Sequence, residues 1–251
     1  MNSQNISQAI SADTVDTCEQ ARLKELRRLE ILDSPPERDF EKICELAART
    51  LHASMAAVVL VDETRAWFKA HSGIQLQEVS RPLSFCQHVC ASEEMLIVKD
   101  ASCDERFKDN PLVTAEPFIR FYAGAPLVTA SGAILGSLSV VDSEARPQGL
   151  TAEEGATLKS LASLAVDILE RRLHSQKLER AQKQLRLFDR ILDSVGDAVL
   201  VTDAEPLDEP GPRIRYVNRA FEQMTGWASA DVIGKSPRLL QGPKSSPAAR
   251  P

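Results

Sequence analysis

Residues 106–127 carry the side chains whose types best suit ligand binding. Their sequence, RFKDNPLVTAEPFIRFYAGAPL, combines basic, aromatic and proline residues in an apolar background. Arg106 and Arg120, together with Lys69, could donate charge-assisted hydrogen bonds to an anion such as a cyclic nucleotide. Several aromatic rings could stack against such a ligand: Trp67, Phe85, Phe107, Phe121 and Tyr122. These residue types indicate a wall that faces a ligand.

A purely structural role for the same side chains is the alternative. Arg106 could pair with a nearby aspartate, either Asp104 or Asp109, instead of a ligand. Both interpretations stay open at the level of the sequence. The ligand-binding candidates are Trp67, Phe85, Cys86, Arg106, Arg120 and Tyr122.

The run SFCQHVCA places two thiols and an imidazole close together. Cys86, His88 and Cys90, with Cys103 further along, could form a site for a soft metal ion. The spacing argues against this, because residues two apart on a helix point in different directions and His88 would face away. We therefore expect reduced, buried thiols, no metal and no catalytic residue.

The prolines in 106–127 limit which element can present its side chains. Pro111, Pro117, Gly124 and Pro126 exclude a helix, so we expect a loop followed by a short strand. Alternation along that strand would place Arg120 and Tyr122 on one face. Ile119 and Phe121 would then share the other face.

The rest of the chain supplies strands and helices in an order typical of an antiparallel α+β fold. The run at 55–62 is apolar and β-branched, as in a strand buried on both faces, and 67–73 is its hairpin partner. Further predicted elements are helices from 18 to 32, from about 40 to 51 and at 84–91, and strands at 95–98, 122–128 and 133–141. Thr151 begins a long helix as its N-cap.

Composition excludes several classes of protein. The chain has 251 residues, 43% of them hydrophobic, which suffices for at least one core. A net charge of −6 disfavours nucleic-acid binding, which needs a basic face. The apolar runs are too short to cross a membrane, and the N-terminal residues lack the basic region followed by an apolar one that is typical of a signal peptide. Five scattered cysteines indicate reduced thiols, and so we expect a cytoplasmic protein.

Six motifs occur in an order that resembles the GAF sensor domains of bacterial signalling proteins. They are LDSPPERDF (32–40), WFKAHSG (67–73), SFCQHV (84–89), VKDAS (98–102), RFKDNPLV (106–113) and IRFYAGAPL (119–127). The resemblance implies a GAF-type antiparallel sheet flanked by helices, at residues 19–172 after a disordered tail at 1–18. Some enzymes of this fold reduce free methionine sulfoxide, so Cys86, Cys90 or Cys103 could serve a reductase as the alternative function.

A long helix without proline or glycine continues from Leu158 to Leu192. Heptad spacing relates Leu161 to Ile168, and it relates Leu178, Leu185 and Leu192 to one another, with Leu164 on the same register. Polar residues interrupt this seam. We expect a coiled-coil-like signalling linker at 173–193 and a homodimer formed through residues 158–192.

The last part of the chain resembles the first half of a PAS domain. YVNRAFEQMTGW (216–227) and VIGKSPRLLQG (232–242) carry the resemblance, which covers residues 194–251 as a partial α/β module. In the related blue-light LOV domains a cysteine in this stretch captures flavin, and here the matching residue is Pro237. A flavin adduct is therefore excluded at this position, and because the chain ends before the later strands we expect a truncated domain.

These resemblances together imply a non-catalytic input fragment. It would sense a small ligand or the redox state and transmit through a dimeric helix to a downstream signalling protein or a missing output domain. No phosphate-binding loop, kinase motif or cyclic-di-GMP enzyme motif is found in the sequence. A truncated gene product without its own function is a further alternative, and the identity of the ligand and of any cofactor stays unknown.

Overall fold

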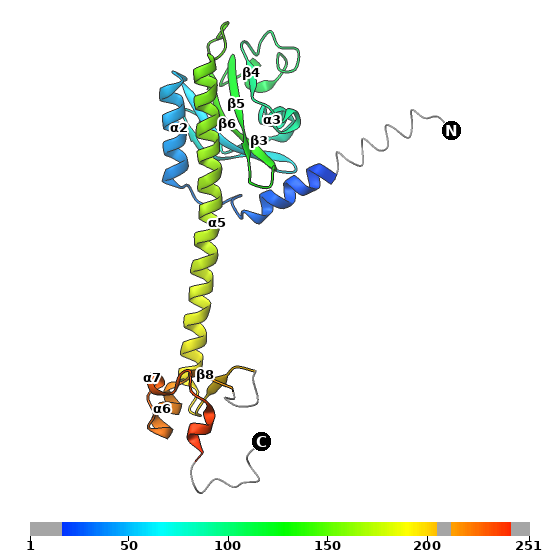
Figure 1. Ribbon diagram of the computed structural model, residues 1–251. Helices are drawn as coiled ribbons and strands as arrows, with labels where there is room; N and C mark the ends of the chain where they lie inside the picture. Colours follow the sequence, from blue (N-terminus) through cyan, green and yellow to red (C-terminus); the bar gives the residue numbers. More distant parts are fainter. Residues whose placement is uncertain (1–16, 205–211, 242–251) are drawn as a thin grey trace, which may run out of the picture. The chain divides into compact units, whose positions relative to one another are not determined.

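The computed structural model describes residues 17–204 and 212–241 and divides the chain into two units, Met1–Ser175 and Gln176–Pro251 (Figure 1). Most of the expected tail at 1–18 lies outside the described residues. Thr17 and Cys18 are already helical, because one helix covers residues 17–28, so the tail prediction is wrong for these two residues.

A six-stranded antiparallel sheet forms the centre of the first unit. Its strand order is β3-β2-β1-β6-β5-β4. The strands are β1 (Met55–Val61), β2 (Arg65–Ser72), β3 (Glu78–Ser80), β4 (Leu96–Val98), β5 (Phe121–Val128) and β6 (Ile134–Asp142). All seven residues of β1 are buried, which confirms the prediction from its continuous apolar run. The strand β3 has no counterpart among the predicted elements.

Two long helices cover one face of this sheet, which we call the helical face. They are α2 (Arg38–Thr50) and α5 (Ala152–Ser194), whereas the N-terminal helix at 17–28 lies at one end of the sheet and runs away from them (Figure 1). Their apolar stripes pack with the sheet into one closed core that includes Leu26, Phe40, Leu138 and Leu169. Thr151 and Glu154 begin α5 with reciprocal hydrogen bonds, as the N-cap prediction requires.

Shorter elements cover the other face, which we call the cavity face. They are α3 (Cys86–Ser92), the single turn α4 (Pro111–Thr114) and the 3-10 turn η1 (Arg81–Leu83), joined by irregular segments. A second apolar cluster lies here and includes Val59, Phe85, Phe107 and Tyr122. The two faces therefore have separate cores on opposite sides of the same strands.

The segment 106–127 differs from its prediction in two details. Pro111 begins the helix α4, because a helix can start with a residue that lacks an N–H, and Asn110 caps it by accepting a hydrogen bond from the Leu112 N–H. The expected strand alternation is also wrong before Phe121. Ile119 lies on the cavity face with Tyr122, because residues 118–120 are not yet in the strand.

The second unit contains a smaller core. The antiparallel strands β7 (Leu200–Thr202) and β8 (Ile214–Val217) precede α6 (Arg219–Thr225), α7 (Ser229–Val232) and the 3-10 turn η2 (Pro237–Leu240). Ile214, Val217, Phe221 and Val232 are buried together. The run SVGDAVLVTD (194–203) predicts a strand over its whole length, but only Leu200–Thr202 form one, and Ser194 is the last residue of α5. Among the described residues, no helix has the length and apolar character needed to span a membrane.

Candidate functional site

A cavity of about 40 Å³ lies on the cavity face, between the sheet and its irregular cover. The strands contribute Val59, Phe68, Tyr122 and Val141 to its wall, and α3 contributes Cys86. Two parts of the cover close it. The irregular segment at 73–77 contributes Ile74 and Leu76, and α4 with the irregular segment after it contributes Leu112, Pro117 and Ile119. A ligand could therefore enter by displacing loop residues, without opening the sheet.

Stacked aromatic rings fix one wall of the cavity. The ring of Phe85 lies 4.1 Å from that of Phe107 and 4.9 Å from that of Tyr122, measured between centroids. His88 meets Phe107 edge-on at 4.9 Å. Such contacts hold the rings in fixed orientations, whereas residues 73–77 and 115–120 close the cavity without helix or strand.

Tyr122 places a hydroxyl group inside this wall. Its oxygen lies 3.5 Å from the Cys86 Sγ, to which it donates, and 3.1 Å from the Ser137 Oγ. Burial raises the pKa of Tyr122 well above its ordinary value, so the phenol stays protonated. The ring needs a glycine at position 124, because a Cβ there would lie 2.2 Å from the tyrosine oxygen.

The structure brings together three of the six predicted ligand-binding residues, namely Phe85, Cys86 and Tyr122. Trp67 lies on the helical face instead. Arg106 pairs with the Asp104 carboxylate at 2.7 and 2.9 Å, as the structural alternative required. The ligand-binding role of all six residues stays a prediction.

Arg120 also lies outside the cavity wall. Its guanidinium donates to the backbone carbonyls of Val113 and Ile119, at 2.8 and 3.1 Å. These contacts hold the turn α4 against the start of β5. Arg120 therefore shapes the border of the cavity without lining it.

The cysteines are free thiols with contrasting surroundings. Burial raises the pKa of Cys44 and of Cys90 to about 12, which keeps both protonated and weakly nucleophilic. Cys103 is exposed, and its Sγ lies 3.7 Å from the Asp100 carboxylate. Within residues 17–204 and 212–241, no group of three or more His, Cys, Asp or Glu side chains is placed to hold a metal ion.

Lys69 has a position that sequence reasoning missed. It was considered as a donor to an anionic ligand, yet its ammonium group is buried on the helical face and donates to Ser34, Pro35 and Glu37 of this chain. Glu37 also accepts a hydrogen bond from Arg172 of α5 at 2.7 Å. One carboxylate thus joins a strand of the sheet to the long helix.

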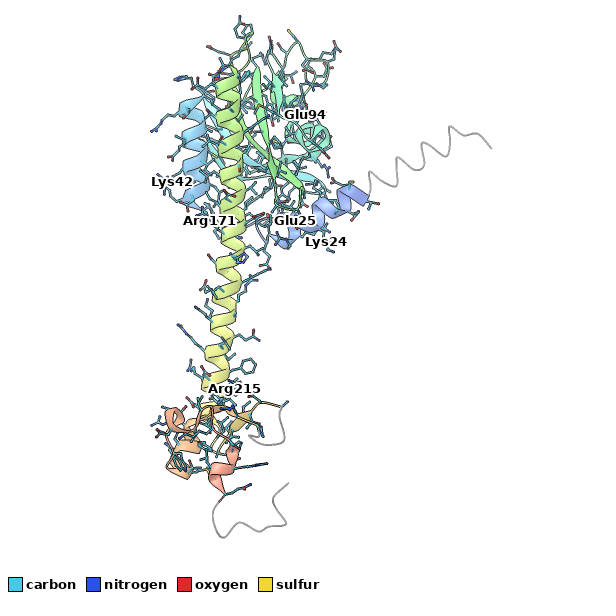
Figure 2. The ribbon with its side chains drawn as sticks, in the orientation of Figure 1. Lys24, Glu25, Lys42, Glu94, Arg171 and Arg215 are labelled. Carbon is cyan, nitrogen blue, oxygen red and sulfur yellow. The ribbon has the colours of Figure 1, made fainter. Side chains whose placement is uncertain are left out.

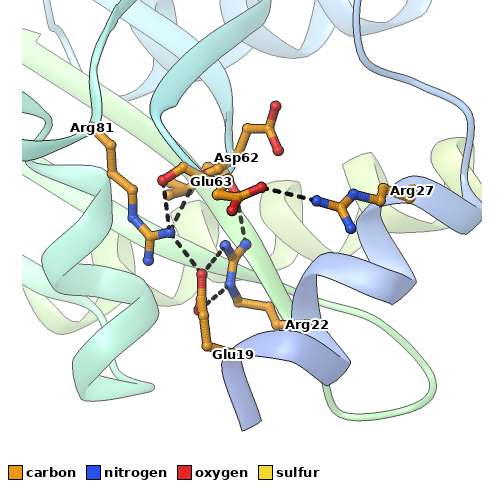
Figure 3. Close-up of polar contacts among 7 residues, drawn as sticks. Glu19, Arg22, Arg27, Asp62, Glu63 and Arg81 are labelled. Atoms are coloured by element: carbon orange, nitrogen blue, oxygen red, sulfur yellow. Dashed lines mark hydrogen bonds and ion pairs between the residues drawn. The ribbon is translucent and has the colours of Figure 1, made fainter. Parts of the chain in front are cut away.

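A second polar cluster fastens the N-terminal helix to the sheet (Figure 3). Arg22 donates to the Val61 carbonyl at 2.6 Å and pairs with Glu19, which Arg81 also contacts at 2.7 Å. Hydrogen bonds from these two guanidinium groups lower the pKa of Glu19 to about 2. Only the i, i+3 spacing of Glu19 and Arg22 could have signalled part of this cluster.

The long helix α5 changes character along its length. Leu161 and Leu169 are buried in the core of the helical face, so Leu161 is not available to the predicted seam. Farther on, Leu178, Leu185 and Phe188 are 62%, 65% and 55% exposed. Charged side chains such as Lys42 on α2 and Arg171 on α5 are exposed as well (Figure 2).

Comparison with known families gives two matches in sequence. The model of the GAF domain matches residues 35–168, and that of the PAS domain matches residues 186–248. A Pseudomonas aeruginosa protein named a cyclic di-GMP phosphodiesterase is 39% identical over 149 residues, which are 59% of this chain and 25% of that protein. A blue-light-activated histidine kinase of Erythrobacter litoralis is 46% identical over 52 residues, 21% of this chain and 14% of the kinase.

The chain therefore spans a quarter or less of the length of these curated relatives. Among solved structures, the GAF domain of Thermosynechococcus elongatus PixJ is 19% identical with a TM-score of 0.47, covering 64% of this chain and 94% of that one. A GAF domain from an Acinetobacter phosphotransferase is 22% identical with a TM-score of 0.44, over 64% of this chain and 98% of that one.

Proposed function

Because the chain belongs to the GAF domain family and carries a PAS domain after its GAF domain, we propose that it is a non-catalytic sensory protein. A small ligand would bind in the cavity at Tyr122, and α5 would transmit its presence. We assign the sensory domain to residues 19–172 and the transmitting linker to 173–193. The PAS domain follows within 194–251.

One observation carries this proposal, the cavity on the side of the sheet away from α5. Its wall is rigid at the aromatic stack and irregular at the segments that close it. A site of this kind can take up a small molecule and change its cover on binding. Transmission then requires that the ligand bind two arrangements of the cover with different affinity, since a ligand shifts a population only by that difference.

The exposed leucines of α5 support transmission by pairing with a second copy. Leu178 and Leu185 are one heptad apart, and Phe188 lies three residues after Leu185. This spacing is that of a coiled-coil seam, in which apolar side chains of two parallel helices interlock. A homodimer through this part of α5 would bury side chains that one chain leaves in water.

The output would belong to a downstream signalling protein or to a further domain. Relatives that share the GAF or PAS region bear the names of a cyclic di-GMP phosphodiesterase and a histidine kinase. Those activities are proposed here only as the kind of output that such a module controls. No nucleic acid is expected as a partner, given the net charge of −6.

The reductase alternative depends on one observation, the position of Cys86 in the cavity wall. A reductase needs a thiolate that attacks the sulfoxide sulfur, whereas Cys90 nearby has a strongly raised pKa. Incubation of the purified protein with free methionine sulfoxide and a thiol reductant separates the functions. Consumption that Cys86→Ser abolishes would favour the enzyme.

Light scattering of the whole chain tests the proposed route of transmission. We expect the mass of a dimer for the unaltered protein and of a monomer for Leu178→Glu/Leu185→Glu, because charged seam residues cannot be buried together. Lys183→Gln on the same helix is the matched control and should stay dimeric. A monomeric unaltered protein would refute transmission through paired helices.

A further inference from the structure

The cavity wall contains no ionised side chain. Its fifteen described lining residues are apolar, aromatic, serine or cysteine, although arginines lie close by in the sequence. Arg106 is paired with Asp104, and Arg120 is turned to backbone carbonyls. A charged group inside this cavity would therefore lose its water without gaining a counter-charge.

The polar atoms of the wall are already hydrogen-bonded. The Ser84 Oγ accepts from the Cys86 N–H at 3.1 Å, and the Ser139 Oγ donates to the Ala57 carbonyl at 3.4 Å. Tyr122 differs from these two. Its oxygen lies 3.1 Å from the Ser137 Oγ, where either hydroxyl can donate, and when Ser137 donates, the Tyr122 proton goes to the Cys86 sulfur, a weak acceptor at 3.5 Å. Its proton can be taken over by a better acceptor at small cost.

From these contacts we infer that the ligand of this cavity is a small, uncharged and mostly apolar molecule with one acceptor oxygen directed at Tyr122. The inference rests on the proposed sensory function. A cavity of about 40 Å³ holds roughly three water molecules, so the ligand has few non-hydrogen atoms. Cyclic nucleotides and other anions, which the arginines first suggested, do not fit this chemistry.

Methyl NMR of the whole chain tests the inference with a matched pair of probes. Isobutyramide and isobutyrate have the same shape, but only the second is charged at pH 7. We expect isobutyramide to shift the methyl signals of Ile119 and Val141 in a saturable way. Isobutyrate should bind at least about tenfold more weakly, because its carboxylate would be buried without a partner.

Variants locate the effect. Tyr122→Phe should weaken the binding of isobutyramide about threefold or more. Xenon needs no hydrogen bond and should shift the same methyl signals in the unaltered protein and in Tyr122→Phe. Ile119→Phe should abolish the shift of Val141 by filling the cavity, and Leu46→Phe on the exposed side of α2 should leave it unchanged. Circular dichroism checks that each variant is folded.

Equal binding of amide and carboxylate, or no shift of the cavity methyl groups with isobutyramide, would overturn the inferred ligand class. These readouts are local to the cavity and do not depend on oligomeric mass. A failed dimer test would thus refute the transmission route alone, whereas a failed titration would refute the ligand class.

A separate observation concerns the register of β1 and β2. Val58 pairs with Ala70 and Val59 pairs with Phe68, so Lys69 is the extra residue of a β-bulge. Phe68 lines the cavity, whereas the next side chain, Lys69, is buried on the helical face. Ordinary alternation places Phe68 and Lys69 on opposite faces, and the bulge then directs Lys69 and Ala70 in succession to the helical face.

The contacts beyond Lys69 lead to α5. Its Nζ lies 2.7 Å from the Glu37 carboxylate, which the Arg172 Nε contacts at 2.7 Å. Arg172 also donates at 3.1 Å to the backbone carbonyl of Glu30, which follows the N-terminal helix in the sequence. The geometry points to Glu37 as a positioning residue that carries a movement of Phe68 to α5, which again presupposes the sensory function.

Amide hydrogen exchange of the whole chain tests this second inference. Glu37→Gln and Lys69→Met should speed exchange in residues 161–175 of α5 at least about tenfold, with β5 and β6 changed less than about twofold. Glu45→Gln removes a carboxylate that pairs with Arg38 on the surface of α2 and is the matched control. Equal acceleration in α5 and in the sheet, or none in α5, would contradict the positioning role.

Discussion

The two faces of the first unit's sheet use the same strands but are covered in different ways. On the helical face, α2 and α5 place continuous apolar stripes on the strands, and side chains such as Phe40 and Leu138 are fully buried. On the cavity face, α3 and α4 have only seven and four residues, and irregular segments complete the cover. The cavity at Tyr122 lies on the second face, whereas the hollow beside α2 and β2 is polar and is lined by residues such as Glu41, Glu45 and Lys69.

The difference shows how one sheet can serve both stability and binding. Long amphipathic helices fill the surface they cover, because their side chains repeat in register with the strands below. Short turns cannot repeat in this way and leave space between them. The side with the better packing thus holds the fold, while the other can exchange contacts with a ligand.

The largest expected effect is a core deletion on the helical face. Phe40→Ala should lower the free energy of unfolding by about 3–5 kcal/mol, because the side chain is fully buried and its loss leaves a void. Ile119→Ala beside the cavity should cost about 2 kcal/mol at most, since its surroundings are already incompletely packed. Urea denaturation of both variants measures the contrast, and equal losses would break the comparison.

The second largest loss of stability is expected when the carboxylate that joins β2 to α5 is removed. Glu37→Gln leaves the buried Lys69 ammonium without its counter-charge and should cost about 2–3 kcal/mol, below the value for a fully buried pair because Glu37 is partly exposed. Glu45→Gln is the control. If Glu37→Gln lowers the free energy of unfolding no more than Glu45→Gln does, Glu37 contributes no more to stability than an exposed surface carboxylate.

The same site gives a dependence on pH with a definite sign. Burial lowers the pKa of Lys69 in the folded chain below 10.5, its value in the unfolded chain. Between the folded and the unfolded pKa, the unfolded chain therefore binds more protons than the folded chain. Stability from this group therefore rises as pH increases through that window. Unfolding of the unaltered protein and of Lys69→Met, followed between pH 8 and about 11, should show the rise in the first only.

A smaller change is expected at the cavity. Tyr122→Phe removes a hydroxyl whose partners are the Cys86 sulfur and the Ser137 hydroxyl, and it should cost about 1 kcal/mol. Thermal unfolding measures this. A cost near that of Phe40→Ala would mean that Tyr122 is part of the structural core and not of an adaptable wall.

The smallest change concerns the polar cluster of the N-terminal helix. Because the pKa of Glu19 is lowered from 4.5 to about 2, its contribution is present above pH 4.5 and is lost as pH falls toward 2. Glu19→Gln should flatten the acid limb of stability by about 1 kcal/mol or less, since solvent reaches this pair. Identical acid limbs in the two proteins would contradict the role of this carboxylate.

Local patterns were enough to predict most of the fold. The apolar run of β1, the hairpin of β5 and β6, and the cap at Thr151 depend on neighbouring residues along the chain, and the structure confirms them. Order of motifs then supplied the GAF and PAS assignments. These features need no knowledge of distant contacts.

The site could be predicted only in part, because its features depend on packing between distant segments. Lys69 reads as an ordinary strand residue, since the bulge exists only in its register with β1. The Arg120 guanidinium lies outside the cavity because it donates to the backbone carbonyl of Val113. No sequence pattern predicts this contact. Phe85 and Tyr122 are predicted from the sequence as rings that could stack on a ligand, and the cavity wall contains both of them together with Cys86.

Both faces are compared most directly by following a methyl group on each during one titration. Leu169 of α5 is buried on the helical face, and Ile119 lines the cavity. As isobutyramide is added to the whole chain, we predict that both methyl signals shift with the same midpoint, and that Lys69→Met keeps the shift of Ile119 but loses that of Leu169. Saturation of Ile119 with no change at Leu169 in the unaltered protein would contradict the claim that a ligand on one face is sensed on the other.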